Sequence, residues 1–294
     1  MTPSKPLTLE QVCSQAQRLP CSPSLLPRLI AVLQDTNSGV GEIEDVIQLD
    51  PALTASTVRL ANSAFFAKSE PVQSVGEAVM RLGQKEIFKL ASLALANRWE
   101  SGAGKGAYQG DPGDFSRHAL CVGLAAEALA ERTGEVNSEA AYTAGLVCDM
   151  GKLAIAQICG AFFPEIRVQR AKQGGSWLEA ERAVLGYDHA QVGARLLRTW
   201  NFPAMFISAA EYYHRPAQAP AGSRPLLGHL HAAKFLAVSY GAGVTEEGFL
   251  FELDEAFLAA CGFTPEQLLE LLPVMHERAL ARLGDKLHFG PVTS

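Results

Sequence analysis

The residues most able to carry chemistry lie where an apolar run ends in a carboxylate. Gly145–Val147 lead into Cys148 and Asp149, and Met150 continues the apolar character. Because an unpaired charge is expensive to bury, a cation must meet Asp149, either a metal ion or a basic side chain. A thiolate at Cys148 is a second possible ligand, since thiolates bind zinc or iron.

Histidines in helical context supply further polar side chains. His118 begins an apolar helical segment, His189 follows a capping aspartate, and His214 ends a helix. Each also has a purely structural explanation: a hydrogen-bonded core histidine, a first-turn residue, and a C-terminal residue favoured by the helix dipole. Lys234 lies three residues after His231, hence on the same helix face.

The elements that must position these side chains are helices. Helix-start signals recur, and strand signals are nearly absent apart from a weakly extended segment at Val244–Leu253. The start signals are Asp50-Pro51, Ser74 with Glu77, Ser176 with Glu179, and Thr264 with Gln267. Gly83 and Gly134 stand where helix C-terminal caps would fall. We therefore predict an all-α protein.

Composition sets the outer limits. The chain has 294 residues, of which 48% are hydrophobic and 19% charged, enough apolar material for a sizeable core. The net charge of −6 argues against broad nucleic-acid binding. Apolar runs fall short of the roughly 18 residues of a membrane helix and no signal peptide is evident, so we expect a cytoplasmic protein that does not insert in membranes. Six cysteines without a CxxC pair exclude a disulfide framework and a zinc finger.

Glycine marks the predicted division of the chain. The stretch from Ser101 to Asp114 is too rich in glycine for a helix interior. We predict an N-terminal helical subdomain at residues 7–100, a connection at 101–113, a C-terminal helical subdomain at 114–285 and a tail at 286–294.

Several blocks in a fixed order resemble one protein family. They are Asp50–Leu53, Leu60–Phe66, Ser74–Ala78, Leu82-Gly83, Gly186–Ala190, Gly193-Ala194, Trp200–Pro203 and Tyr213-His214. Over residues 20–240 the sequence resembles the HDOD branch of the HD superfamily. The resemblance implies an N-terminal helical bundle packed on an HD-like C-terminal helical bundle. It also implies a bacterial signalling module that kept the fold of metal phosphohydrolases and generally lacks demonstrated hydrolase activity.

The resemblance also implies a remnant metal pocket. Carried over by position, it comprises His118, Cys148, Asp149, His189, Tyr213, His214 and Lys234. Cys148, Tyr213 and Lys234 depart from the ligand types of HD enzymes, which carry an acidic residue at the position of Lys234. Should a metal bind, its ligands would be His118, Cys148, Asp149, His189 and His214.

Lys234 is the largest obstacle to a metal. Two unit charges about 4 Å apart interact by roughly 4 kcal/mol at an effective dielectric of about 20, so an ammonium opposes a neighbouring cation. We expect Lys234 to pair with Asp149 instead, which makes the site structural and leaves no catalytic residue, no cofactor and no bound metal.

The expected function is a non-enzymatic regulatory or scaffold module of signal transduction, acting on protein partners whose identity the sequence does not give. Two alternatives stay open. One is a metal-dependent phosphohydrolase that uses the surviving ligands, with Cys148 as a soft ligand. The other is a pocket that binds a nucleotide messenger such as cyclic di-GMP without cleaving it.

A basic zone in the N-terminal half offers a partner surface beside Phe65-Phe66. It comprises Arg59, Lys68, Arg81, Lys85 and Lys89. Such a zone suits an acidic partner or a phosphate-bearing ligand, although a solvated helix face is the commoner explanation of such a charge pattern.

Overall fold

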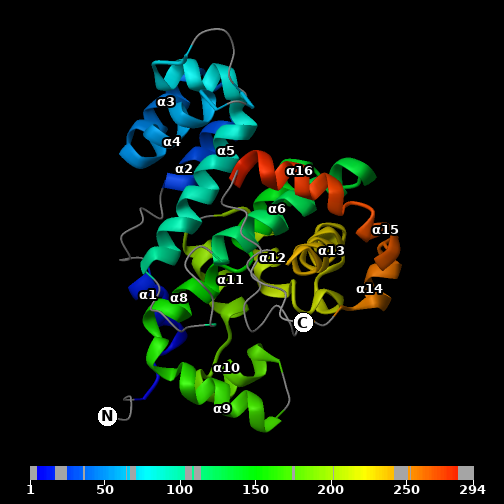
Figure 1. The fold of residues 1–294 in the computed structure, drawn as a ribbon. Helices are drawn as coiled ribbons and strands as arrows, with labels where there is room; N and C mark the ends of the chain where they lie inside the picture. The colour runs from blue at the N-terminus through cyan, green and yellow to red at the C-terminus, as the bar shows by residue number, and fades with distance from the viewer. Residues whose placement is uncertain are drawn as a thin grey trace. The chain divides into compact units, whose positions relative to one another are not determined.

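Helices account for the secondary structure of this protein. The computed structural model describes residues 5–16, 25–35, 37–63, 65–66, 71–102, 108, 114–173, 176–200, 202–241, 251 and 253–283. Within these ranges the elements are α-helices and short 3-10 helices, without a strand (Figure 1). The all-α prediction is confirmed.

Contacts within the chain define two compact units. The smaller unit, residues 21–95, holds α2 (Leu25–Gln34), α3 (Val40–Gln48), α4 (Pro51–Ala61) and most of α5 (Val75–Gly102). The larger unit, residues 1–20 and 96–294, holds the other helices. These are α1 (Leu9–Ala16), α6 (Asp114–Thr133), α7 (Ser138–Val147), α8 (Met150–Ile158), α9 (Phe163–Gln173), α10 (Trp177–Leu185), α11 (His189–Thr199), α12 (Ala204–Tyr212), α13 (Arg224–Tyr240), α14 (Glu255–Ala260), α15 (Pro265–Leu269) and α16 (Leu272–Leu283).

The first helix belongs to the larger unit, although the smaller unit follows it in the sequence. Helix α1 packs on α8 and α11, and the Tyr187 hydroxyl donates to the carbonyl oxygen of Leu7 at 3.0 Å. The predicted N-terminal subdomain at residues 7–100 did not anticipate the packing of α1 on α8 and α11. Its boundaries stay a prediction. Apart from residues 101, 102 and 108, the glycine-rich connection lies outside the described residues, as does the 286–294 tail.

Local capping chemistry explains where several helices begin. Asp50 accepts a hydrogen bond from the Leu53 amide at 3.0 Å, and α4 begins at the proline between them. Ser176 and Glu179 form the predicted capping box of α10. Gly83, with φ of 77° and ψ of 163°, is non-helical and joins two helical segments of α5 across a kink, so the first segment ends at the predicted glycine. The predicted extended segment at Val244–Leu253 lies almost wholly outside the described residues.

The core of the larger unit is built around α6. Residues 119–130 of this helix are all buried, and α7 and α13 pack against it. Close contact with α7 is possible because both helices carry glycine there: a Cβ atom added to Gly145 would lie 2.7 Å from the Cα atom of Gly123. This contact fixes the end of α7, and with it the chain that leads to Asp149.

Among the described helices, the length and apolar character of a membrane-spanning segment are met only by one bent pair. No single helix in the described ranges has the length and apolar character needed to cross a membrane. The pair Ser138–Ile158 and Gly160–Lys172, bent by 83°, meets those criteria on length and composition alone.

Gly145→Ala should destabilise the protein by about 1–3 kcal/mol, because the added methyl group forces α6 and α7 apart. Chemical denaturation measures the free energy of unfolding. The matched control is Gly160→Ala, whose added Cβ meets nothing within 4 Å. Equal stability of the two variants would contradict the packing described for α6 and α7.

Candidate functional site

The site is centred on a carboxylate between two helices. Asp149 lies between the last residue of α7 and the first of α8, rather than within one continuous helix. Helix α8 approaches α11 closely at Gly151, where a Cβ atom would lie 1.9 Å from the His189 carbonyl oxygen. Only glycine allows this approach, so Gly151 sets the separation between Asp149 and His189.

Two ammonium groups and a phenol bind the buried Asp149 carboxylate. Lys234 Nζ lies 2.7 Å from Oδ2, and Lys152 Nζ lies 2.8 Å from Oδ1. The Tyr213 hydroxyl also donates to Oδ1. Burial by itself raises the pKa of Asp149, but Lys152, Lys234, His118 and His214 together hold it well below its usual value of 3.8. Asp149 is therefore ionised and paired.

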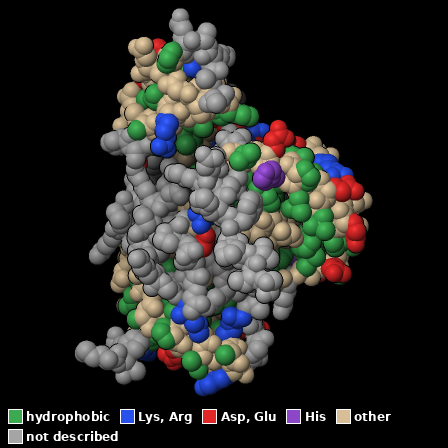
Figure 2. Space-filling view, viewed as in Figure 1, with side chains coloured by type: hydrophobic (Ala, Val, Ile, Leu, Met, Phe, Trp, Pro, Cys, Tyr) green, Lys and Arg blue, Asp and Glu red, His purple; other side chains and the backbone are tan. Residues whose placement is uncertain are grey.

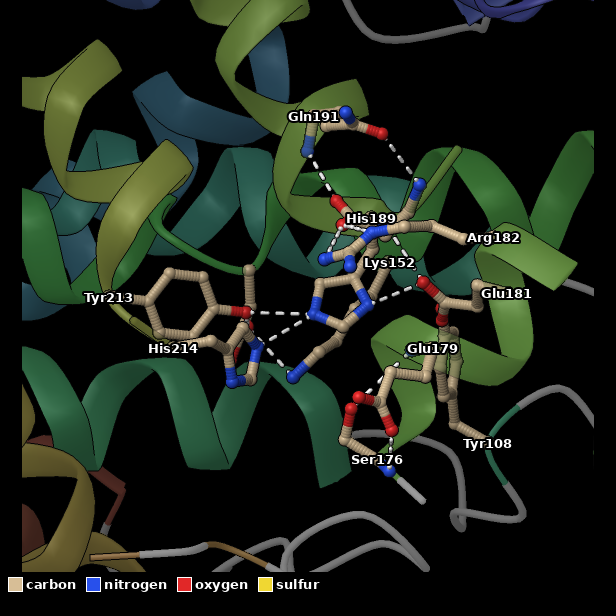
Figure 3. A network of polar contacts seen from close by, with 12 residues as sticks. Tyr108, Lys152, Ser176, Glu179, Glu181, Arg182, His189, Gln191, Tyr213 and His214 are labelled. Carbon is tan, nitrogen blue, oxygen red and sulfur yellow. Dashed lines mark hydrogen bonds and ion pairs between the residues drawn. The ribbon is translucent and has the colours of Figure 1, made fainter. Parts of the chain in front are cut away.

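His189 is held by a second buried carboxylate (Figure 3). Glu181 Oε2 accepts from the His189 backbone amide at 2.8 Å and lies 2.8 Å from Nδ1. Nδ1 therefore carries a hydrogen atom, and in the neutral ring Nε2 is an acceptor. The helix start that positions this histidine is the predicted Asp188 cap, which accepts from the Gln191 amide at 2.8 Å.

His214 completes the polar cluster from the end of α12. Its Nε2 lies 2.7 Å from His189 Nε2, so a neutral His214 donates to His189. Burial, together with the neighbouring His189 and the ammonium groups of Lys234 and Lys152, keeps the pKa of His214 well below 6.5. Possible ligand atoms of Asp149, His189 and His214 all lie within 4.8 Å of one another.

The chain matches the HDOD domain model over residues 19–216, about two-thirds of its length. The chain belongs to the HDOD domain family. The resemblance inferred from the sequence is thus confirmed. The fold expectation that came with it, an HD-like helical architecture, is confirmed as well by the solved structures of similar proteins.

Solved structures of similar proteins cover nearly the whole chain. An HDOD domain protein of unknown function from Geobacter sulfurreducens is 24% identical, with a TM-score of 0.70 over 92% of this chain and 96% of that one. A candidate phosphohydrolase from Shewanella amazonensis is 26% identical, with a TM-score of 0.69 over 94% and 97%. A candidate signal transduction protein from Marinobacter aquaeolei is 24% identical, with a TM-score of 0.71 over 94% and 60%.

One curated relative is longer than this chain. An uncharacterized protein from Treponema pallidum is 25% identical over 235 residues, which cover 75% of this chain. The match spans 43% of the Treponema protein's length, so this HDOD chain corresponds to less than half of it.

The other residues predicted for the HDOD pocket have different surroundings. His118, on α6, is near enough for its charge to lower the pKa of Asp149. Cys148 is buried and donates to the Gly145 carbonyl oxygen at 3.3 Å. Burial, aided by the Asp149 charge, raises the pKa of Cys148 to about 12, so without a metal it is a neutral thiol.

The donor set was tested against the metal that HD enzymes bind. One carboxylate and two imidazoles suit iron, manganese or zinc, and a carboxylate behind a ligating histidine, like Glu181, is common in metal sites. Both oxygens of Asp149, however, are engaged by ammonium groups. A divalent ion at this carboxylate would meet two like charges, the ammonium groups of Lys152 and Lys234. These residues do not fit a divalent metal while both lysines are charged.

Sequence reasoning missed three members of the cluster. Lys152 lies one helical turn after Asp149 and could have been found from its spacing of three residues. Glu181 is an acidic residue that is fully buried, and the hydrophobic periodicity around it could have indicated this burial. Tyr108, whose hydroxyl donates to Glu181 at 2.6 Å, stands in the glycine-rich stretch and carries no local signal.

His214→Gln should reduce the loss of stability on acidification. The unfolded chain takes up a proton at His214 as pH falls through about 6.5, whereas the folded protein keeps this ring neutral, so protonation favours unfolding. Between pH 7.5 and 5.5 the wild type should lose about 1 kcal/mol more than the variant. Urea denaturation at both pH values measures this difference. His229 and His231, whose pKa values burial also lowers, are present in both proteins and cancel. Identical pH dependence would contradict a His214 that stays neutral in the folded protein.

Proposed function

We propose that this HDOD chain is a non-enzymatic regulatory module of signal transduction, in which lysine side chains take the role of the metal. The observation that carries the proposal is the double engagement of Asp149, by Lys234 at Oδ2 and Lys152 at Oδ1. An ammonium that neutralises a buried carboxylate stabilises the fold without supplying a Lewis acid. The pocket would then hold the helices together rather than activate water.

Names of similar proteins offer both roles by analogy. The Marinobacter protein is described as a candidate signal transduction protein, and the Shewanella protein as a candidate phosphohydrolase. A shared fold does not transfer chemistry, because chemistry depends on the side chains of the site. Here those side chains favour the signalling description.

Regulation through protein contacts requires a surface, and we propose one on the smaller unit. Figure 2 shows apolar and basic side chains exposed there. Arg59 is exposed, Lys85 is partly exposed, and Phe65 and Met80 are 66% and 69% exposed. Such a mixture of aromatic, methionine and basic side chains suits an acidic protein partner.

The structure corrects the composition of this surface. Lys89 is 6% exposed and lies 3.5 Å from Glu86, so it is buried and leaves the predicted set. Arg81 is partly exposed, and its guanidinium reaches the Ala61 carbonyl oxygen at 3.5 Å. Lys68 lies outside the described residues.

A metal-dependent phosphohydrolase is the second candidate function. It is favoured by the convergence of Asp149, His189 and His214 within 4.8 Å and by Glu181 behind His189. It would require Lys152 and Lys234 to leave the carboxylate, which costs the free energy of both ion pairs. We therefore rank it below the regulatory role.

Metal content separates the two candidates. Protein purified without chelator or nickel resin should contain far less than one equivalent of manganese, iron or zinc by mass spectrometry, and should not cleave phosphodiesters or phosphomonoesters when these metals are added. Lys234→Asp should raise the metal content, because it replaces a positive charge with a ligand. Wild-type metal near one equivalent, lost in Asp149→Asn together with hydrolase activity, would contradict the regulatory proposal.

Removal of the lysines tests their proposed structural role. Lys234→Met should destabilise the protein by roughly 2–4 kcal/mol, because one partner of a buried ion pair is lost. Lys152→Met should destabilise the protein by a similar amount. In each single variant the remaining lysine still pairs with Asp149 and limits the loss. The double variant should then cost more than the sum of the two, as measured by chemical denaturation. Strict additivity, or a neutral effect of Lys234→Met, would argue against a shared role.

A further inference from the structure

Tyr108 is a described residue in a glycine-rich stretch, and its side chain is buried. It is 6% exposed, although glycines stand close to it on both sides in the sequence. Its φ of 52° lies in the left-handed region, the only such value for a non-glycine residue among those described. A side chain there strains the backbone, so surrounding contacts must stabilise this conformation.

Those contacts come from an aromatic enclosure with a polar end. The Tyr108 ring meets Phe163 edge-on, with centroids 4.7 Å apart, and lies 5.4 Å from Trp177 and 6.4 Å from His189. Edge-to-face geometry at these distances is favourable for aromatic pairs. The hydroxyl donates to Glu181 Oε1 at 2.6 Å. Figure 3 shows Tyr108 reaching Glu181 from the side opposite His214.

We propose that Phe163, Trp177, His189 and Glu181 form a socket for a phenol side chain, and that Tyr108 is its intramolecular ligand. Recognition has two parts: aromatic edges select a flat ring, and a buried carboxylate oxygen selects a hydroxyl donor. Glu181 uses its other oxygen, Oε2, for His189. Tyr108 therefore shares one carboxylate with the pocket histidine, which links this point of the chain to the polar cluster.

This socket does not depend on the proposed function. His189 donates to Glu181 through Nδ1 whether its Nε2 faces His214 or another group. The link nevertheless gives a regulatory module a means of communication: a change at His189 alters the carboxylate that holds Tyr108. Coupling of this kind requires a shared group, and Glu181 is that group.

Cavity rescue tests the socket directly. Tyr108→Gly removes the ring and relieves the positive φ, which leaves an aromatic cavity with a carboxylate at its end. p-Cresol, the side-chain analogue of tyrosine, should raise the Tm of this variant by several degrees, and toluene should raise it less because it lacks the hydroxyl. p-Cresol should not stabilise the wild type, since the tethered Tyr108 outcompetes a free ligand. In Tyr108→Gly/Glu181→Gln the preference for p-cresol over toluene should shrink.

A second measurement covers the case in which Tyr108→Gly fails to fold. Tyr108→Phe keeps the ring and removes only the hydroxyl, and its matched control is Tyr187→Phe, which removes another buried hydroxyl, the one bonded to Leu7. Trypsin cleavage after Lys105 should be at least about threefold faster in Tyr108→Phe than in the wild type and unchanged in Tyr187→Phe. Equal rescue by toluene and p-cresol, or wild-type cleavage in Tyr108→Phe, would overturn the proposal.

Discussion

The ion pairs of one buried carboxylate are the constraint on which the rest of the site depends. Asp149 is 2% exposed, and a lone charge at that depth would cost several kcal/mol. Lys152 from its own helix and Lys234 from α13 offset this cost, and the Tyr213 hydroxyl adds a third donor. Because these donors come from α8, α13 and the end of α12, the carboxylate ties three helices together. Removing its charge would leave two ammonium groups buried without their partner.

Close helix packing makes this arrangement possible. Glycine at position 151 lets α8 lie against the His189 backbone, and glycine at 145 lets α7 lie against α6. Both contacts would be broken by a single methyl group. His189 lies between two carboxylates. Its Nδ1 contacts Glu181, and its Nε2 contacts Tyr213 and His214, which separate it from Asp149. The site is therefore one continuous polar network, and the close backbone packing at Gly145 and Gly151 fixes the helices that carry it.

Much of this could be predicted from the sequence, for identifiable reasons. The cap at Asp50-Pro51 and the capping box at Ser176 are local signals, and local chemistry was enough to locate the starts of α4 and α10. The expected contact between Asp149 and Lys234 is present at 2.7 Å, since a buried charge demands a partner and the family resemblance placed Lys234 in the same pocket. Residues that bond over long sequence separations were harder to find. Tyr108 bonds to Glu181 across 73 residues, and no periodicity encodes that distance. The packing of α1 on α8 and α11 was missed because these helices are also far apart in the sequence.

Crystals of the wild-type protein grown with millimolar manganese would show whether lysine or a metal ion neutralises Asp149. An anomalous difference map locates a bound manganese ion without ambiguity, and the same data give the positions of both lysines. We predict no anomalous peak among Asp149, His189 and His214, with Lys234 Nζ within hydrogen-bond distance of Asp149. A peak about 2.2 Å from these ligands, with Lys234 turned away, would contradict this prediction.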